Sequence, residues 1–232
     1  QYFRFPMVWK RTGDNIDKIS NTSRFSQRNS ELAIEENSVN RRVRNVTRRL
    51  LSDDWYTLNK YTFEYQADNG QWQRQSREAY DRGNGATILL FNKNLGTVIL
   101  TRQFRLPTYI NGNTDGMLIE SCAGLLDNDN AKDCIVKETE EETGYRIEKP
   151  KKVFEAYMSP GAVTEILHFF VAEYRKEDKV SEGGGLKNEQ ENIEVLELSF
   201  AEALNMIQSG AIKDGKTIML LQYAKLQSLL EH

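Results

Sequence analysis

The chain has little cysteine, no long apolar run and almost no net charge. Its two cysteines, Cys122 and Cys134, provide no disulfide framework and lack the CxxC or histidine-paired spacing of a zinc or thiol-nucleophile site. Apolar runs such as ATILLF are far shorter than the ~20 residues of a membrane-spanning helix. With a net charge of −3, no global field attracts nucleic acid or an anionic membrane. We therefore expect a cytoplasmic protein with no nucleic-acid or membrane partner.

Several catalytic signatures are also missing. The sequence contains no glycine-rich phosphate loop, no GxSxG elbow and no dinucleotide fingerprint, so those chemistries have no support. What is present is ordinary for a globular protein, because 39% of the 232 residues are hydrophobic and 28% are charged. These values predict one large domain or a domain with an appendage.

The domain organisation follows from changes in composition along the chain. The stretch DNIDKISNTSRFSQRNSELAIEENSVNRR is polar and rich in Asn and Ser without a clear period, which predicts that residues 1–49 form a flexible extension. Within them, RRVRNVTRRL at 41–50 is interpreted as a solvated basic strand or helix start, with docking of a phosphate or acidic partner as the alternative. Residues 50–82 are expected to form an amino-terminal β-hairpin around the turn DNG, and residues 83–229 the main domain.

The main domain alternates strand and helix patterns without an internal repeat. GATILLF and TVILTRQFR predict a central hairpin, and MLIESCAG predicts a further strand. KKVFEAYM, ILHFFVAEY and IEVLELS are also typical of strands, whereas FAEALNMIQSG and GKTIMLLQYAKLQSLL are typical of helices. The order predicts an α+β fold with a mixed sheet.

The segment NAKDCIVKETEEET predicts a helix that Gly144 ends. On that helix Glu138, Glu141 and Glu142 fall at i, i+3 and i+4, so their carboxylates project from one face although like charges there are unfavourable. Oxygen ligands on a rigid element suit Mg²⁺, with Mn²⁺ as a substitute. The alternative interpretation is a solvated acidic helix face.

The segment AGLLDNDNAKDCIVKETEEETGY resembles the signature of the Nudix hydrolases: Gly, five residues, Glu, seven residues, Arg-Glu, an apolar residue, any residue, Glu-Glu, any residue and Gly. The matching positions are Gly124, Lys137, Glu138, Glu141, Glu142 and Gly144. One residue is missing before Glu138, and the substituted positions are Lys137 for Arg, Thr139 for the apolar residue, and Asp129 or Asn130 for the first Glu.

With SREAYDRGNGATILL, RQFR, LIESCAGLLDND, YMSPGAVTE, IEVLEL and IKDGKT, the shortened signature is similar to the GDP-mannose pyrophosphatase branch of that family over residues 50–228. The resemblance implies the Nudix fold, an α/β/α sandwich with a mixed β-sheet, carrying an amino-terminal antiparallel β-hairpin.

The resemblance also implies site residues. The expected metal ligands are Glu138, Glu142, Glu191 and the backbone carbonyl of Ala123. Glu191 is expected to be the base or a further metal ligand, with Glu189 as the second choice. Glu141 is expected to be an auxiliary ligand or to orient a water. The glycines at 183–185 would form a hinge for this loop or reflect simple disorder.

The expected substrate contacts complete the site. Arg105 and Lys216 would bind phosphate, and Glu165 would accept hydrogen bonds from sugar hydroxyls. The remaining substrate-binding positions are Trp55, which would stack on the base, Arg77, Glu78, Ala123, Gly124 and Leu125. By the same resemblance, a homodimer that exchanges its amino-terminal hairpin would bring Arg77, Glu78 and Trp55 to the partner's active site.

These expectations imply a nucleotide-sugar substrate. The favoured reaction is hydrolysis of GDP-mannose to GMP and mannose 1-phosphate, with an ADP-ribose or ADP-sugar pyrophosphatase as the neighbouring alternative. A Nudix-fold module that binds a nucleotide without cleaving it is the alternative from another class. Retention of the three helix glutamates argues against that module.

Overall fold

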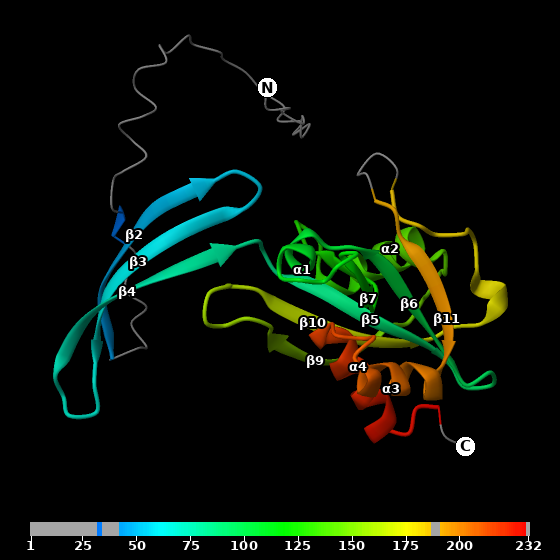
Figure 1. Cartoon of the computed structure of the whole chain (residues 1–232). Coiled ribbons are helices and arrows are strands. Elements are labelled where there is room, and N and C mark those ends of the chain that lie inside the picture. Colours follow the sequence, from blue (N-terminus) through cyan, green and yellow to red (C-terminus); the bar gives the residue numbers. More distant parts are fainter. Residues whose placement is uncertain (1–31, 34–41, 187–190, 231–232) are drawn as a thin grey trace, which may run out of the picture. The chain divides into compact units, whose positions relative to one another are not determined.

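The computed structural model describes residues 32–33, 42–186 and 191–230 of the chain (Figure 1). Contacts divide the chain into two compact units, one of residues 1–51 and 60–76 and the other of residues 52–59 and 77–232. None of the described helices is long and apolar enough to cross a bilayer.

The first region is a four-stranded sheet with the strand order β1-β2-β3-β4. The strands are β1 (Leu32–Ala33), β2 (Val43–Asp53), β3 (Thr57–Gln66) and β4 (Trp72–Asp81). The expected hairpin is confirmed as β3 and β4. The prediction that the chain is a flexible extension up to residue 49 is wrong from Val43 onward, because these residues form β2. Residues 1–31 and 34–41 lie outside the described part of the chain.

From Val43 onward the basic stretch forms β2, and two of its arginines find partners in the neighbouring hairpin. Arg44 Nε lies 2.7 Å from Glu64 Oε2, and the Arg44 guanidinium carbon lies 3.8 Å from the centre of the Trp72 ring. Arg42 Nη1 lies 2.8 Å from Asp68 Oδ1. Cross-strand pairs of opposite charge stabilise a sheet, which supports the interpretation as a basic strand.

The main sheet is mixed and has seven strands, with the order β11-β6-β5-β10-β9; β7 pairs with β6 and β8 with β5. β10 runs parallel to β5, whereas its pairing with β9 is antiparallel. The strands are β5 (Gly85–Asn92), β6 (Thr97–Phe104), β7 (Met117–Glu120), β8 (Ala123–Leu125), β9 (Lys151–Tyr157), β10 (Ile166–Glu173) and β11 (Glu194–Ser199).

Alternation along the central strand produces a core on each side of the sheet. In β5, Leu89 and Phe91 belong to one buried cluster, and Ile88 and Leu90 belong to the other. Since every residue of β5 is buried, both faces of the strand must be covered. The structure therefore has the three-layer α/β/α arrangement expected from the sequence.

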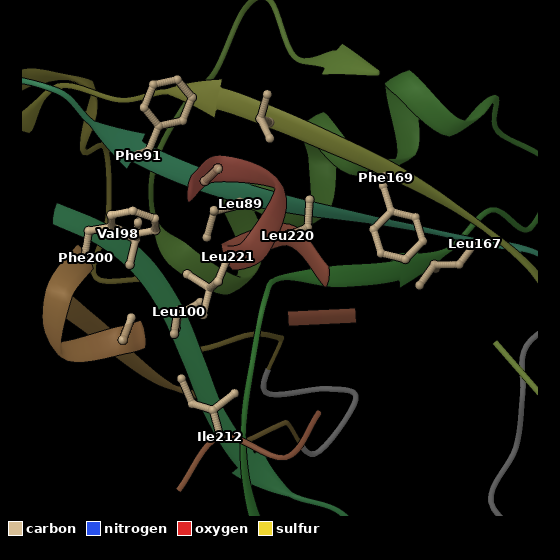
Figure 2. Packing of buried hydrophobic residues seen from close by; sticks show 13 residues of the cluster. Leu89, Phe91, Val98, Leu100, Leu167, Phe169, Phe200, Ile212, Leu220 and Leu221 are labelled. Carbon is tan, nitrogen blue, oxygen red and sulfur yellow. The ribbon is translucent and has the colours of Figure 1, made fainter. Parts of the chain in front are cut away.

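The helices provide those covers. Figure 1 shows α2 (Ala131–Thr143) on one face of the sheet and α3 (Phe200–Ser209) with α4 (Gly215–Leu226) on the other. Figure 2 shows Leu220 and Leu221 of α4 packed among side chains of β5, β6 and β10. Two short helical segments, α1 (Leu106–Ile110) and η2 (Lys176–Asp178), were not expected.

The expected single strand MLIESCAG is wrong in one respect, because it is divided at Ser121 and Cys122. β7 pairs with β6 and ends at Glu120, whereas β8 starts at Ala123 and pairs with β5. The chain therefore passes from one strand to its neighbour within two residues. Glu120 therefore pairs with Thr101 of β6, and Ala123 pairs with Thr87 of the adjacent strand β5. The candidate site lies at this break.

Candidate active site

Local capping fixes both ends of the acidic helix α2. The Asn130 side chain accepts hydrogen bonds from the backbone N–H groups of Lys132 and Asp133 at the start. Gly144 ends the helix with φ of 77°, a conformation that glycine adopts without steric cost. The predicted helix and its predicted end are confirmed.

Glu142 faces inward from α2 and is 3% exposed. Its Oε2 atom is buried and has no hydrogen-bond partner among the described residues. Burial, together with the charges of Glu138 and Glu191, raises the pKa of Glu142 to about 8, although Cys122 and Arg105 act in the opposite direction. Two of the glutamates expected as metal ligands, Glu138 and Glu191, therefore lie within electrostatic range of the third, Glu142.

Gly124 allows Glu138 to lie directly against strand β8. A Cβ atom at residue 124 would lie 2.3 Å from Cγ and Cδ of Glu138 and 2.4 Å from its Oε1. Only glycine leaves room for this contact. The carboxylate of Glu138 thus lies against Gly124 of β8, next to the Ala123 carbonyl, whose expected role in metal binding stays a prediction.

The other two glutamates of the helix lie on its outer side. Glu140 accepts hydrogen bonds from Arg146 at 2.9 and 3.0 Å, as expected for a residue that points away from the site. Glu141 lies 3.9 Å from Lys137 Nζ and lines an open surface hollow together with Lys132, Val136 and Glu140. Among the four glutamates, only Glu138 and Glu142 face the sheet. The expectation that Glu141 projects from the same face is therefore wrong, and a role for Glu141 stays a prediction.

The three glycines at 183–185 attach the loop of Glu191 to the end of α2. All three have positive φ, and Gly184 and Gly185 donate hydrogen bonds to the carbonyls of Glu142 and Glu141 at 2.9 and 3.1 Å. Those carbonyls belong to the last turn of the helix, where backbone acceptors lack intrahelical donors. The glycines are therefore explained by backbone conformation and a close approach, which neither the hinge nor the disorder interpretation included.

The same loop orients Glu191. Its Oε2 accepts a hydrogen bond of 2.9 Å from the backbone N–H of Leu186, and a Cβ atom at Gly185 would lie 2.4 Å from that oxygen. Ile193 N–H donates to the carbonyl of Gly184 at 3.2 Å, which closes the base of the loop. Glu189, the second choice for the base, lies outside the described residues.

The donor set fits a divalent cation. In the described part of the chain, no three acidic, histidine or cysteine groups are already arranged around one point as metal ligands. The buried and unpartnered Oε2 of Glu142, close to two more carboxylates, is nevertheless the environment that a hard cation stabilises. Glu138, Glu142 and Glu191, with the Ala123 carbonyl, are the groups that could hold it.

Two cations lie near these carboxylates. Arg105, the residue before α1, donates from Nε to Glu120 Oε2 at 2.6 Å, and Lys216, in the first turn of α4, donates to Glu120 Oε1 at 2.5 Å. Burial lowers the pKa of Arg105, but the charges of Glu120, Glu142 and Asp214 outweigh burial, so the pKa is raised. The contribution of Glu142 places the Arg105 guanidinium within electrostatic range of that carboxylate.

Glu165 lies close to Gly85, the first residue of β5, which also lies close to the Gly124 carbonyl of β8. A Cβ atom at Gly85 would lie 3.1 Å from the Gly124 carbonyl and 3.4 Å from Glu165 Oε1. Glu165 is 9% exposed, and its Oε1 lies 3.4 Å from Arg82 Nε. This carboxylate therefore borders the same end of β5 and β8 as Glu138, as a sugar-binding group would need to.

Aromatic side chains flank that end of the sheet. The ring of Tyr56 packs edge-on against Tyr80 and Trp55, with centroid distances of 5.8 and 6.3 Å. Tyr80 also pairs with the chain before Glu165, since its N–H donates to the Ala162 carbonyl at 2.7 Å. Trp55 is 74% exposed, which leaves its ring open to stacking.

The structure places the remaining residues and adds one that the sequence did not indicate. Arg77 and Glu78 are exposed on β4, so their expected role in nucleotide binding stays a prediction. Glu120 had no expected role although it connects both cations. The available signal was a carboxylate at the end of the apolar run MLIE, where an acidic side chain needs a buried partner.

Comparison with known proteins gives matches along most of the chain. The model of the NUDIX domain matches residues 81–221, and that of the GDP-mannose pyrophosphatase NudK N-terminal domain matches residues 42–80. A GDP-mannose pyrophosphatase of Yersinia enterocolitica is 59% identical over 190 residues, which are 82% of this chain and 98% of that protein.

Further relatives have the same name. A GDP-mannose pyrophosphatase of Yersinia pestis is 57% identical over 80% of this chain and 92% of its own length. One of Pectobacterium atrosepticum is 60% identical over 77% of this chain and 92% of its own length. Both matches extend over nearly all of the relative.

Proposed function

The chain belongs to the Nudix hydrolase family, and from this premise we propose that it hydrolyses GDP-mannose to GMP and mannose 1-phosphate. The observation that carries the proposal is the opposite character of two groups in the site. One consists of Glu142, whose buried Oε2 has no hydrogen-bond partner among the described residues, and the carboxylates of Glu138 and Glu191. The other consists of the cations Arg105 and Lys216. A pyrophosphate with a bound divalent cation is complementary to both. Relatives named GDP-mannose pyrophosphatase at 57–60% identity support the choice of sugar nucleotide.

In this proposal Glu138, Glu142, Glu191 and the Ala123 carbonyl hold Mg²⁺, which would neutralise phosphate charge and lower the pKa of a bound water. Hydrolysis forms a bond between the oxygen of water and phosphorus and breaks the bridging P–O bond. The water must lose a proton in this step, and Glu191, which the glycine loop orients, is the proposed acceptor. Glu141 would help to orient the water.

Binding groups surround this centre in the proposal. Arg105 and Lys216 bind phosphate oxygens, Glu165 accepts hydrogen bonds from the sugar, and the backbone of Ala123, Gly124 and Leu125 contacts the substrate. Trp55, Arg77 and Glu78 bind the nucleotide of the partner subunit in a homodimer. A monomer with full activity, shown by light scattering at assay concentration, would contradict the dimer and leave the chemistry unaffected.

We propose that the protein acts in the cytoplasm.

The test of function incubates the protein and Mg²⁺ with GDP-mannose, ADP-ribose, ADP-glucose or UDP-glucose in parallel and identifies the products by mass spectrometry. We expect GMP and mannose 1-phosphate to form fastest, and Glu142→Gln to abolish their formation. Glu140→Gln is the matched control, because Glu140 belongs to the same helix but pairs with Arg146 on its outer side.

Each other outcome identifies a different error. Preferential cleavage of ADP-ribose would retain the chemistry and overturn the substrate. Binding of GDP-mannose without turnover of any of the four substrates would overturn the enzyme proposal in favour of a binding module.

A further inference from the structure

We infer that Glu120 is a positioning residue that holds Arg105 and Lys216 together as one phosphate clamp. This inference deepens the proposed function and rests on it. Arg105 and Lys216 come from elements far apart in the sequence, the start of α1 and the first turn of α4. Glu120 is the group that both contact, and the sequence assigns it no role.

The geometry at Glu120 makes it a bridge. Each carboxylate oxygen accepts from a different cation, Oε2 from Arg105 Nε at 2.6 Å and Oε1 from Lys216 Nζ at 2.5 Å. Glu120 is 4% exposed, so both bonds form with little competition from water. The bond to Arg105 engages Nε, one of five N–H donors of the guanidinium, and thereby restrains the orientation of the group.

The position of Lys216 relative to Glu120 is itself fixed. Asp214 caps α4 by accepting from the N–H and hydroxyl groups of Thr217 at 3.0 and 2.6 Å. The Thr217 hydroxyl in turn accepts a 2.6 Å bond from the N–H of Ser121, the residue after Glu120. The start of α4 is thus tied to the end of β7, which brings Lys216 against Glu120.

Charge explains why one carboxylate must join the two cations. The Lys216 side chain is 12% exposed, and its ammonium lies 3.1 Å from Asp214 in addition to Glu120. Without Glu120, the partly exposed Arg105 side chain would be free to turn toward solvent, and Lys216 would be left with Asp214 alone. The clamp would then lose its arrangement before substrate binds, and ordering it would reduce affinity.

The test compares Glu120→Gln with Glu155→Gln. The amide retains the shape of the glutamate but directs an N–H₂ group at one of the cations. Glu155 is the matched control, because it also faces two basic groups, Lys152 at 2.6 Å and His168 at 3.2 Å, but on the exposed surface of β9. We expect Glu120→Gln to raise KM for GDP-mannose by about 10- to 100-fold with a smaller change in kcat, and Glu155→Gln to change neither.

A positioning role also predicts loss of the effect when the positioned groups are absent. In an Arg105→Ala/Lys216→Ala background, Glu120→Gln should change KM by less than about 2-fold, because residues that act through one another are not additive. An equal KM for Glu120→Gln and wild type, or an undiminished effect in the double-alanine background, would overturn the inference.

A second comparison applies if Glu120→Gln does not fold. The variant Glu120→Gln/Lys216→Gln carries no unmatched lysine and is compared with Lys216→Gln alone. We expect a higher KM in the double variant, since Arg105 is also released. Identical KM values would contradict the inference.

The same assay separates this inference from the proposed function. Failure of the wild type to hydrolyse GDP-mannose would refute the proposed substrate, and the comparison would then use whichever of the four sugar nucleotides is cleaved. If none is cleaved, calorimetric titration with GDP replaces KM. Weaker GDP binding by Glu120→Gln would support the clamp, whereas equal binding, or no binding by the wild type, would overturn it.

Discussion

The site contains two glutamates that are almost equally buried, Glu120 with 4% and Glu142 with 3% of its surface exposed. Glu120, at the end of β7, gives each of its oxygens to a cation. Glu142, in the last turn of α2, has a buried oxygen without a partner among the described residues and two further carboxylates within electrostatic range. Burial alone therefore does not distinguish the two positions, but their partners do.

The difference separates a preformed part of the site from one that needs a ligand. Glu120 belongs to structural ion pairs, because its negative charge is neutralised by cations of the protein itself. Glu142 lies where a carboxylate is unfavourable unless a cation arrives, because burial and like charges both oppose ionisation. Substitution of each glutamate should therefore have different consequences for activity and for stability.

The largest expected effect is the loss of activity in Glu142→Gln. An amide supplies a weaker ligand and no charge, so we expect kcat with saturating Mg²⁺ to fall by about 1,000-fold or more, in line with the several kcal/mol that a catalytic metal contributes. Steady-state assays of product formation would measure it. Activity within 10-fold of wild type would remove Glu142 from the metal site.

The next effect, a loss of about 10- to 100-fold in kcat, is expected for Gly185→Ala, because displaced catalytic groups lose rate steeply. A Cβ atom there would lie 2.4 Å from Glu191 Oε2, so the side chain must move. The matched control is Gly96→Ala, since Gly96 also has positive φ, at +64°, but a Cβ atom added to it would meet nothing within 4 Å. Both variants should lose stability because of the positive φ, and Gly185→Ala should lose more because its Cβ also meets Glu191. Equal activity of the two variants would show that the loop does not position Glu191.

The pH dependence of stability sharpens the comparison further. In metal-free protein the pKa of Glu142 is raised from 4.5 to about 8, so the folded state binds more protons than the unfolded state between these values. Stability from this group is complete below pH 4.5 and is lost as the pH rises through 8. We expect the unfolding midpoint of the wild type to fall by a few degrees relative to Glu142→Gln between about pH 5 and about pH 9 in EDTA.

Groups that titrate in both proteins change both unfolding midpoints equally, so their contribution cancels in the difference between wild type and Glu142→Gln. Differential scanning calorimetry at several pH values would measure it. A constant difference across the range would show that Glu142 is already ionised and compensated without metal. Glu120→Gln should instead be destabilised at every pH, since it removes the buried negative charge that both Arg105 and Lys216 contact.

The elements that carry the site could be predicted from the sequence because their signals are local. The apolar positions of α2 and Gly144 at its end fix that helix, and two continuous apolar runs joined by a turn fix the β5–β6 hairpin. Glu138 and Glu142 share a helix face by spacing alone. The proximity of Glu191 was available only from the resemblance, because the intervening chain gives no periodic signal.

The parts that the sequence did not predict depend on tertiary contacts. The break between β7 and β8 exists because the two strands pair with different neighbours, and the run MLIESCAG is apolar on both sides of it. The role of Glu120 requires α1 and α4 to meet at one point. Three consecutive glycines suggest flexibility in a sequence, whereas here their positive φ values fit the loop to the end of α2.

The smallest effect is expected on the outer side of α2, where Glu140 pairs with Arg146 in solvent. Arg146 lowers the pKa of Glu140 through hydrogen bonds, but water and salt screen an exposed pair. Glu140→Gln should therefore leave kcat and KM unchanged and shift the unfolding midpoint by less than about 1 °C. Since Glu140 and Glu142 are two residues apart on one helix, a large effect of Glu140→Gln on activity would show that helix charge in general, and not the inward position of Glu142, controls the reaction.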